Sequence, residues 1–232
     1  MQHRLRSALI TTAMGLALFA PSAFAQAPTC PTDPFITDAT GDQAIDPTGQ
    51  GVKQTTHAGQ DNMDITGVSF AWHNDAAGKP VLSVDIGIAN MSMTTMSPTD
   101  SQAGNWYYLW FTVGGTQYFL KAINADGSGM TYHYGLSDAK TIPTFTVYTT
   151  SGDTTGRVVL GPNGHVIIDF PSAIPLPLGT DVSGIYADAD AIQGKDDFYG
   201  VNNHVDQTDT GAGVVDDCGI NVPPEPPDDS GE

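Results

Sequence analysis

Hydrophobic and polar residues alternate along most of the chain, with a period of two. The alternation is broken by glycine, proline, asparagine and aspartate, which favour turns. A period of two is typical of strands that bury one face, and no stretch of similar length has the period of an amphipathic helix. Strands are therefore expected at residues 65–72, 81–89, 106–113, 116–122, 130–134, 145–150, 157–160, 165–170 and 183–189.

Nine or ten short strands at turn spacing predict an all-β protein. The expected fold is a single-domain antiparallel β-sandwich, jelly-roll-like, because nothing in the pattern indicates a parallel sheet. Gly114 and Gly115 predict a two-residue hairpin turn, since both can adopt the positive φ that such turns require. Longer hairpin loops are expected at residues 124–129 and 151–156.

The Gly-Gly turn fixes a register between its two flanking strands. It places Val113 opposite Thr116, Phe111 opposite Tyr118 and Leu109 opposite Leu120, so one face of the hairpin is apolar and belongs to the core. The other face mixes aromatic and polar side chains. Flat rings beside hydrogen-bonding groups suit sugar rings. The candidate carbohydrate-binding residues are Trp106, Tyr108, Trp110, Gln117 and Lys121.

An alternative for this aromatic face is a second buried layer. Residues 91–104 would then cover it, because Met91, Met93 and Met96 are suitable partners for aromatic rings,. An exposed aromatic row would favour carbohydrate binding, whereas complete burial of Trp106, Tyr108 and Trp110 would favour a structural role.

The first 25 residues have the layout of a secretory signal peptide. Arg4 and Arg6 precede an apolar run at residues 8–20, and small residues lead to an expected cleavage after Ala25. This run is shorter than the roughly 20 apolar residues of a transmembrane helix, and no transmembrane segment is expected elsewhere. The sequence predicts a secreted or periplasmic protein whose folded domain spans residues 26–222, followed by a disordered proline-rich acidic tail at 223–232.

The net charge of the chain limits the classes of molecule that are expected to bind it. The formal net charge is −18, and the only glutamates are Glu225 and Glu232, so 26 − 2 = 24 of the acidic residues are aspartates. A surface of this sign repels polyphosphate, which argues against nucleic acid as a partner. Aspartate favours turns and oxygen-ligated cation sites.

The chain has two cysteines, Cys30 and Cys218, near the two limits of the expected domain. In an oxidising compartment, such a pair predicts one disulfide that ties the ends of the domain together.

Two aspartate pairs are candidate calcium ligands. Asp38 and Asp42 flank a tight turn, and Asp61 and Asp64 precede the next strand, so both pairs can meet at one end of a sandwich. Calcium takes about six to eight oxygen ligands, which carboxylates, carbonyls and water can supply. The alternative is an Asx-type turn with solvated carboxylates. A weaker second candidate is the pair Asp188 and Asp190, which lie on one side of a strand.

Several short motifs resemble bacterial DOMON-like β-sandwiches, a group that includes family 9 carbohydrate-binding modules. They are "DATGD" from Asp38, "DI" at Asp64, the aromatic strand before the Gly-Gly turn, and "PSAI" from Pro171. The resemblance covers most of residues 35–191. It implies an extracellular β-sandwich, often appended to hydrolases, that binds sugars in some members and calcium in several. This chain departs from that pattern because it has no catalytic partner domain.

Catalytic signatures are not found in the sequence. It has no Gly-x-Ser-x-Gly, no His-Glu-x-x-His, no P-loop and no Cys-x-x-Cys,. The sequence thus predicts an exported, non-catalytic binding protein with structural calcium and an extracellular polysaccharide or other glycan as ligand. The alternative is a structural or cell-surface-associated exported protein without a small-molecule ligand.

Overall fold

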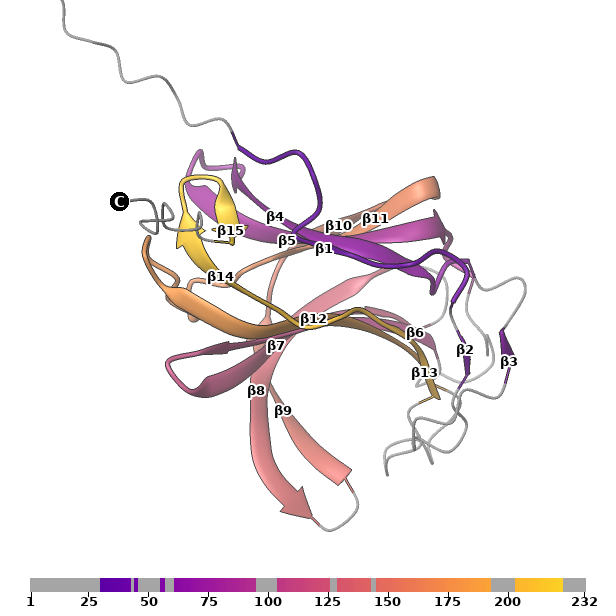
Figure 1. Cartoon of the computed structure of the whole chain (residues 1–232). Coiled ribbons are helices and arrows are strands. Elements are labelled where there is room, and N and C mark those ends of the chain that lie inside the picture. The colour runs from indigo at the N-terminus through magenta and orange to yellow at the C-terminus, as the bar shows by residue number, and fades with distance from the viewer. Residues whose placement is uncertain are drawn as a thin grey trace, which may run out of the picture.

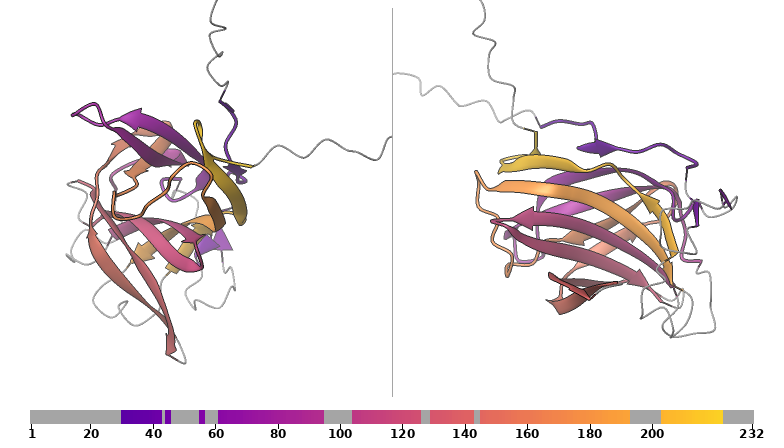
Figure 2. Two further views of the ribbon diagram at one scale, coloured as in Figure 1. Left: turned by 90° about the vertical axis from the view of Figure 1, so that its left-hand side faces the viewer. Right: turned by 60° about the horizontal axis from the view of Figure 1, so that its bottom comes forward.

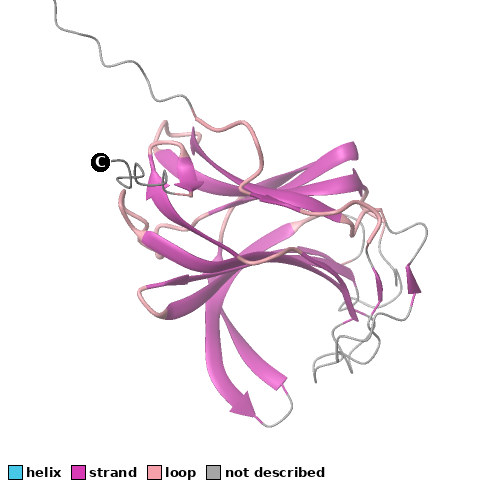
Figure 3. Cartoon of the chain, in the orientation of Figure 1, coloured by secondary structure: helices cyan, strands magenta, loops and turns pink. Residues whose placement is uncertain are grey.

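The computed structural model describes residues 30–42, 44–45, 55–56, 61–94, 104–125, 129–142, 145–192 and 203–222. The predicted signal peptide and the predicted tail lie outside these residues. All the regular structure in the described part is β-strand (Figure 3). No helix in this part is long and apolar enough to cross a membrane.

Fifteen strands occur in the described residues. In chain order they are β1 (Ile36–Thr37), β2 (Ala44–Ile45), β3 (Thr55–Thr56), β4 (Ile65–Asn74), β5 (Pro80–Met91), β6 (Gly104–Val113), β7 (Thr116–Asn124), β8 (Thr131–Ile142), β9 (Phe145–Asp153), β10 (Gly156–Val159), β11 (Gly161–Asp169), β12 (Asp181–Ile192), β13 (Asn203–Gln207), β14 (Gly211–Asp216) and β15 (Gly219–Asn221). The nine segments predicted from the sequence all form strands, and β4 to β12 are their counterparts.

The strands form two main antiparallel sheets that pack face to face (Figures 1 and 2). One sheet has five strands in the order β1-β4-β5-β11-β10. The other has eight, in the order β15-β14-β12-β6-β7-β8-β9, with β13 also paired to β12. A separate two-stranded sheet is formed by β2 and β3. The predicted β-sandwich is confirmed.

The hairpin of β6 and β7 has the predicted register. Val113 pairs with Thr116, Phe111 with Tyr118 and Leu109 with Leu120. On its inner face, Leu109, Phe111 and Leu120 are fully buried in the main core between the two sheets, and Val113 and Tyr118 are partly buried against it. Phe111 contacts Phe170 edge to face. The Gly-Gly turn therefore sets a register in which the apolar residues of both strands face the opposite sheet.

One predicted hairpin loop is instead a crossover. Residues 151–156 connect β9 of the eight-stranded sheet to β10 of the five-stranded sheet. Two backbone hydrogen bonds hold this connection, from Thr154 N to Tyr132 O and from Asp169 N to Thr155 O. The prediction of a hairpin here was wrong, because glycine, aspartate and threonine suit a crossover as well as a hairpin turn.

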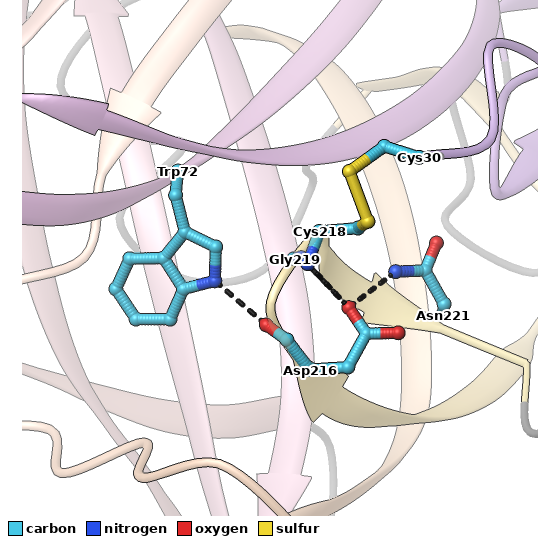
Figure 4. The surroundings of a disulfide bond; sticks show 6 residues. All are labelled: Cys30, Trp72, Asp216, Cys218, Gly219 and Asn221. Atoms are coloured by element: carbon cyan, nitrogen blue, oxygen red, sulfur yellow. Dashed lines mark hydrogen bonds between the residues drawn. A yellow bond between two sulfur atoms is a disulfide. The ribbon is translucent and has the colours of Figure 1, made fainter. Parts of the chain in front are cut away.

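The predicted disulfide is present between Cys30 and Cys218, with a Cα–Cα distance of 5.2 Å (Figure 4). It joins the segment that leads into β1 to the turn between β14 and β15, and so links the two sheets. Asp216 organises this turn, since its Oδ1 accepts hydrogen bonds from the backbone N–H groups of Cys218 and Gly219 and from Asn221 Nδ2. Trp72 Nε1 donates to Asp216 O at 2.8 Å.

Candidate metal centre

Three carboxylates from distant parts of the chain meet at one end of the sandwich. Asp38 and Asp42 lie in the turn after β1, and Asp206 lies on β13. One oxygen from each of these carboxylates lies within 4.8 Å of the others. Among the described residues, this is the group of three or more ligand-type side chains close enough to share a metal ion.

The turn between Asp38 and Asp42 is fixed by Gly41 and Asp64. Gly41 has a φ of +85°, a backbone conformation that side chains with a Cβ rarely adopt,. Its N–H donates to Asp64 Oδ2 at 2.9 Å. Asp64 is 2% exposed, and its other oxygen, Oδ1, is buried and accepts no hydrogen bond from a described residue. A buried carboxylate oxygen without a donor is costly unless a cation or proton compensates it.

Asp206 connects the two sheets at this point. Its Oδ2 accepts a hydrogen bond from Ile65 N, the first residue of β4, at 2.6 Å, and its Oδ1 accepts one from Gln207 N. Because β4 belongs to the five-stranded sheet and β13 to the eight-stranded sheet, the carboxylate cluster spans the gap between them. We call Asp38, Asp42, Asp64 and Asp206 the carboxylate cluster.

The carboxylates of the cluster are negative groups that lie close together. Burial and the neighbouring Asp42 raise the pKa of Asp38 to about 6, and Asp209 and Asp64 contribute further repulsion. Burial, followed by repulsion from Asp38 and Asp42, raises the pKa of Asp206 to about 7. Burial, followed by repulsion from Asp42 and Asp61, raises the pKa of Asp64.

The ion pairs formed by described residues do not compensate this charge. Three of them, His73–Asp169, His133–Asp153 and His165–Asp85, lie away from the carboxylate cluster. A divalent cation would remove the repulsion that protonation removes at lower pH. The available donors are all oxygens, which suits a hard cation such as Ca²⁺ and not the metals that prefer histidine or cysteine.

The structure changes the predicted ligand set in two places. Asp38 and Asp42 come together as expected, whereas Asp61 and Asp64 both lie outside the close group of three carboxylates. Asp64 is buried and contacts the turn of that group through the N–H of Gly41, while Asp61 is exposed. Asp61 acts on the cluster only through its charge, which contributes to the raised pKa of Asp64. Asp206 was missed, because its approach depends on β13 pairing with β12, far along the chain from β1 and β4.

The predicted aromatic platform is not an open surface. Tyr108 and Trp110 are each 3% exposed, and they form a second cluster with the buried Phe119 on the outer face of the eight-stranded sheet. The rings of Tyr108 and Trp110 stack with centroids 5.3 Å apart. Trp106, which is partly exposed, and Tyr186 pack against them. Of the two alternatives for this face, Tyr108 and Trp110 fit the buried layer, because the rings bury one another. Met91 and Met93 do not cover them as that alternative expected, since Met91 lies in the main core and Met93 packs against it.

Lys121 is part of this outer cluster and not a free polar contact at its rim. Its Nζ lies 4.7 Å from the centre of the Trp106 ring and within 6 Å of the Tyr108 and Phe119 rings, so the ammonium is held by cation–π interactions,. Burial lowers the pKa of Lys121 to about 8. Gln117 is partly exposed on the same hairpin, opposite Thr112.

Asp188 and Asp190 share the outer face with these rings. They pair across the sheet with Tyr108 and Trp106, and directly opposed residues point to the same face,. Both aspartates are buried, at 3% and 1% exposure. They are on one side of their strand, as expected, but they are not part of the close carboxylate group.

A Ser–His–Asp contact that sequence reasoning did not find lies on the outer face of the five-stranded sheet. Ser83 Oγ donates to Asp169 Oδ1 at 2.8 Å and lies 2.8 Å from His73 Nδ1, while His73 Nε2 is 3.5 Å from the same carboxylate oxygen. In a catalytic triad, the serine and the carboxylate use opposite ring nitrogens and do not bond to each other. Ser83 is also only 4% exposed, so this group cross-links β4, β5 and β11 and does not present a nucleophile.

Comparisons with protein-family models, curated proteins and solved structures find no match to this chain. The DOMON-like resemblance stays a prediction. The arguments about function below rest on the chain's own geometry.

Proposed function

We propose that the protein is an exported, non-catalytic β-sandwich that holds a structural calcium ion in the carboxylate cluster. Support comes from Asp64, whose Oδ1 is buried without a donor from the described residues beside three other carboxylates that lie close together. Calcium would neutralise these charges and join the turn after β1 to β4 and β13. The disulfide and the predicted signal peptide support a location outside the cytosol.

Calcium is favoured over magnesium by the flexibility of its coordination. Magnesium requires nearly ideal octahedral geometry, while calcium accepts irregular sets of carboxylates, carbonyls and waters. Several oxygens of the cluster already accept backbone hydrogen bonds, from Gly41, Ile65 and Gln207. An irregular set of remaining oxygens suits the larger ion.

The proposal is tested by thermal melting of the mature protein in calcium, in magnesium and in chelator. An ion that binds only the folded state adds about 2.7 kcal/mol at a hundredfold excess over Kd, so calcium should raise Tm clearly. Asp42→Ala should remove most of this gain. The matched control is Asp153→Asn, which removes the same charge from an exposed side chain paired with His133, and it should keep the gain. A melting curve indifferent to calcium and chelator would exclude a structural calcium ion.

The ligand class of the proposed binding protein depends on the aromatic residues of the outer face of the eight-stranded sheet. Burial of Tyr108 and Trp110 supports the alternative of a structural or surface-associated protein, while Trp106 keeps partial exposure and its buried Nε1 has no described partner. Carbohydrate binding stays a prediction centred on Trp106. A glycan array with the wild-type protein and Trp106→Ala tests it: binding that Trp106→Ala abolishes supports a glycan ligand, and an array without binding favours the structural role.

A further inference from the structure

The edges of the two sheets differ greatly in length. The edge strands β1, β10 and β15 have two, four and three residues, whereas β9, the last strand of the eight-stranded sheet, has nine. Short edge strands protect a sheet from pairing with another chain. The edge at β9 lacks this protection.

The sequence of β9 also lacks the residues that normally block edge pairing. It reads FTVYTTSGD and contains no lysine, arginine, glutamate or proline. Its one charge, Asp153, is at its last position. Threonine, valine, tyrosine and phenylalanine all favour strands, and uncharged segments of this kind pair readily when exposed. The strand β9 therefore carries little of the acidic charge of a chain whose formal net charge is −18.

The position of β9 leaves its outer edge without a strand partner among the described residues. On one side it pairs with β8, from His133 opposite Asp153 to Ile142 opposite Phe145, with register shifts between Tyr134 and Gly135 and between Asp138 and Thr141. On the other side no described strand pairs with it. Figures 1 and 2 show the β8–β9 hairpin extending away from the two packed sheets. A second molecule can therefore approach this edge without bringing the two acidic bodies together.

We propose that β9 is a self-association edge, along which the β9 strand of a second copy pairs antiparallel about a two-fold axis. A second copy fits because the strand is uncharged along its first eight residues, the first six of which favour strands, so no like charges oppose each other in the pair,. A two-fold contact is also closed: both copies cover their long edge in one interface, and no further copies add to it. This inference is independent of the carboxylate cluster.

The test compares the mass of the protein in solution for the wild type and for charged variants of the edge. Sedimentation equilibrium of the mature protein should give a concentration-dependent shift to twice the monomer mass. Thr150, an exposed residue of β9 that pairs with Gly135, is changed to Lys and, separately, to Glu. Each variant alone should be monomeric, because two like charges then meet across the two-fold axis. Mixing Thr150→Lys with Thr150→Glu should restore the dimer.

The matched control is Val159→Lys on β10, a 45% exposed residue on the short edge of the other sheet. It should dimerise as the wild type does. Circular dichroism and Tm of each variant confirm that the fold is retained. A wild type that stays monomeric at every concentration overturns the proposal and leaves this edge to a strand of another protein. A dimer that neither Thr150 variant weakens overturns it as well.

Discussion

Two groups of carboxylates in this sandwich differ in the partners of their oxygens. Asp169, on the outer face of the five-stranded sheet, accepts hydrogen bonds from the hydroxyls of Ser83 and Thr155 and lies beside His73. The carboxylate cluster at the end of the sandwich instead gathers Asp38, Asp42, Asp64 and Asp206, with further acidic residues nearby. In the first group the carboxylate accepts hydrogen bonds from protein donors, and in the second the buried Oδ1 of Asp64 has no donor among the described residues.

This difference separates a structural network from an ion site better than residue types do. Serine, histidine and aspartate together suggest catalysis, yet here their geometry satisfies the carboxylate and leaves no free nucleophile. A group of aspartates suggests only a turn, yet Asp64 Oδ1 has no described donor and the pKa values of its neighbours are raised. The discriminating observation is whether each buried oxygen has a donor.

The largest expected effect is at the complete network. Asp169→Ala removes the acceptor for Ser83 and Thr155 and leaves the buried Ser83 hydroxyl with His73 alone. The free energy of unfolding should fall by about 3 kcal/mol. Urea unfolding with and without calcium checks this, and the calcium-induced gain should be unchanged. A stability loss that depended on calcium would mean that the two groups are not independent.

Removing a carboxylate from the carboxylate cluster should instead raise the free energy of unfolding of the metal-free protein. Asp206→Asn keeps an oxygen for Ile65 N–H but removes a charge that repels Asp38 and Asp42. In chelator at pH 8, the free energy of unfolding should rise by about 1–2 kcal/mol, since one pKa unit corresponds to about 1.4 kcal/mol. Isothermal titration should show weakened calcium binding. Destabilisation of the metal-free protein would contradict a site under charge repulsion.

The pH dependence of the metal-free protein should be smaller but of defined sign. The pKa values of Asp38 and Asp206 rise from 3.8 to about 6 and about 7 in the folded state, so the folded state binds protons more readily. Stability from these groups is present below about pH 4 and is lost as the pH rises through 6 to 7. Chelated wild type should therefore melt higher at pH 5 than at pH 8. Asp206→Asn should flatten this trend, and an unchanged slope would argue against Asp206 as its source.

The smallest effect is expected at His73. The hydroxyl of Ser83 keeps its bond to Asp169 when the ring is removed, and the side chain of His73 is 31% exposed. His73→Gln should change the free energy of unfolding by about 0.5 kcal/mol, as for most partly exposed contacts. Chemical denaturation at pH 7 checks this. A loss as large as that of Asp169→Ala would show that the ring, and not the carboxylate, holds the network together.

The sequence was sufficient to predict the features of the fold that depend on the local pattern of residues. Period-two alternation located β4 to β12, and the positive φ values of Gly114 and Gly115 set the register of β6 and β7. The ends of the domain were marked by Cys30 and Cys218. Each of these signals lies within a few residues or requires a single pairing.

Features that depend on neighbours from other strands were not predictable in the same way. Alternation placed Tyr108 and Trp110 on the outer face, but it carries no information on whether Phe119 and Tyr186 bury them there. Asp206 approaches Asp38 only because β13 lies beside β12 and faces the start of β4. These contacts are set by the arrangement of whole strands, which the pattern of one strand does not encode.

The disulfide has a mechanical consequence. Its two Cα atoms are 5.2 Å apart, while 188 residue positions separate the cysteines along the chain. Tension applied between the residue before Cys30 and the residue after Cys218 is carried by the covalent S–S bond and not by the hydrogen bonds of the sheets. An intact disulfide thus makes the sandwich a short, inextensible link in any pulled chain. Reduction would add the contour length of the enclosed residues, so the domain would unfold under load only after the bond is broken.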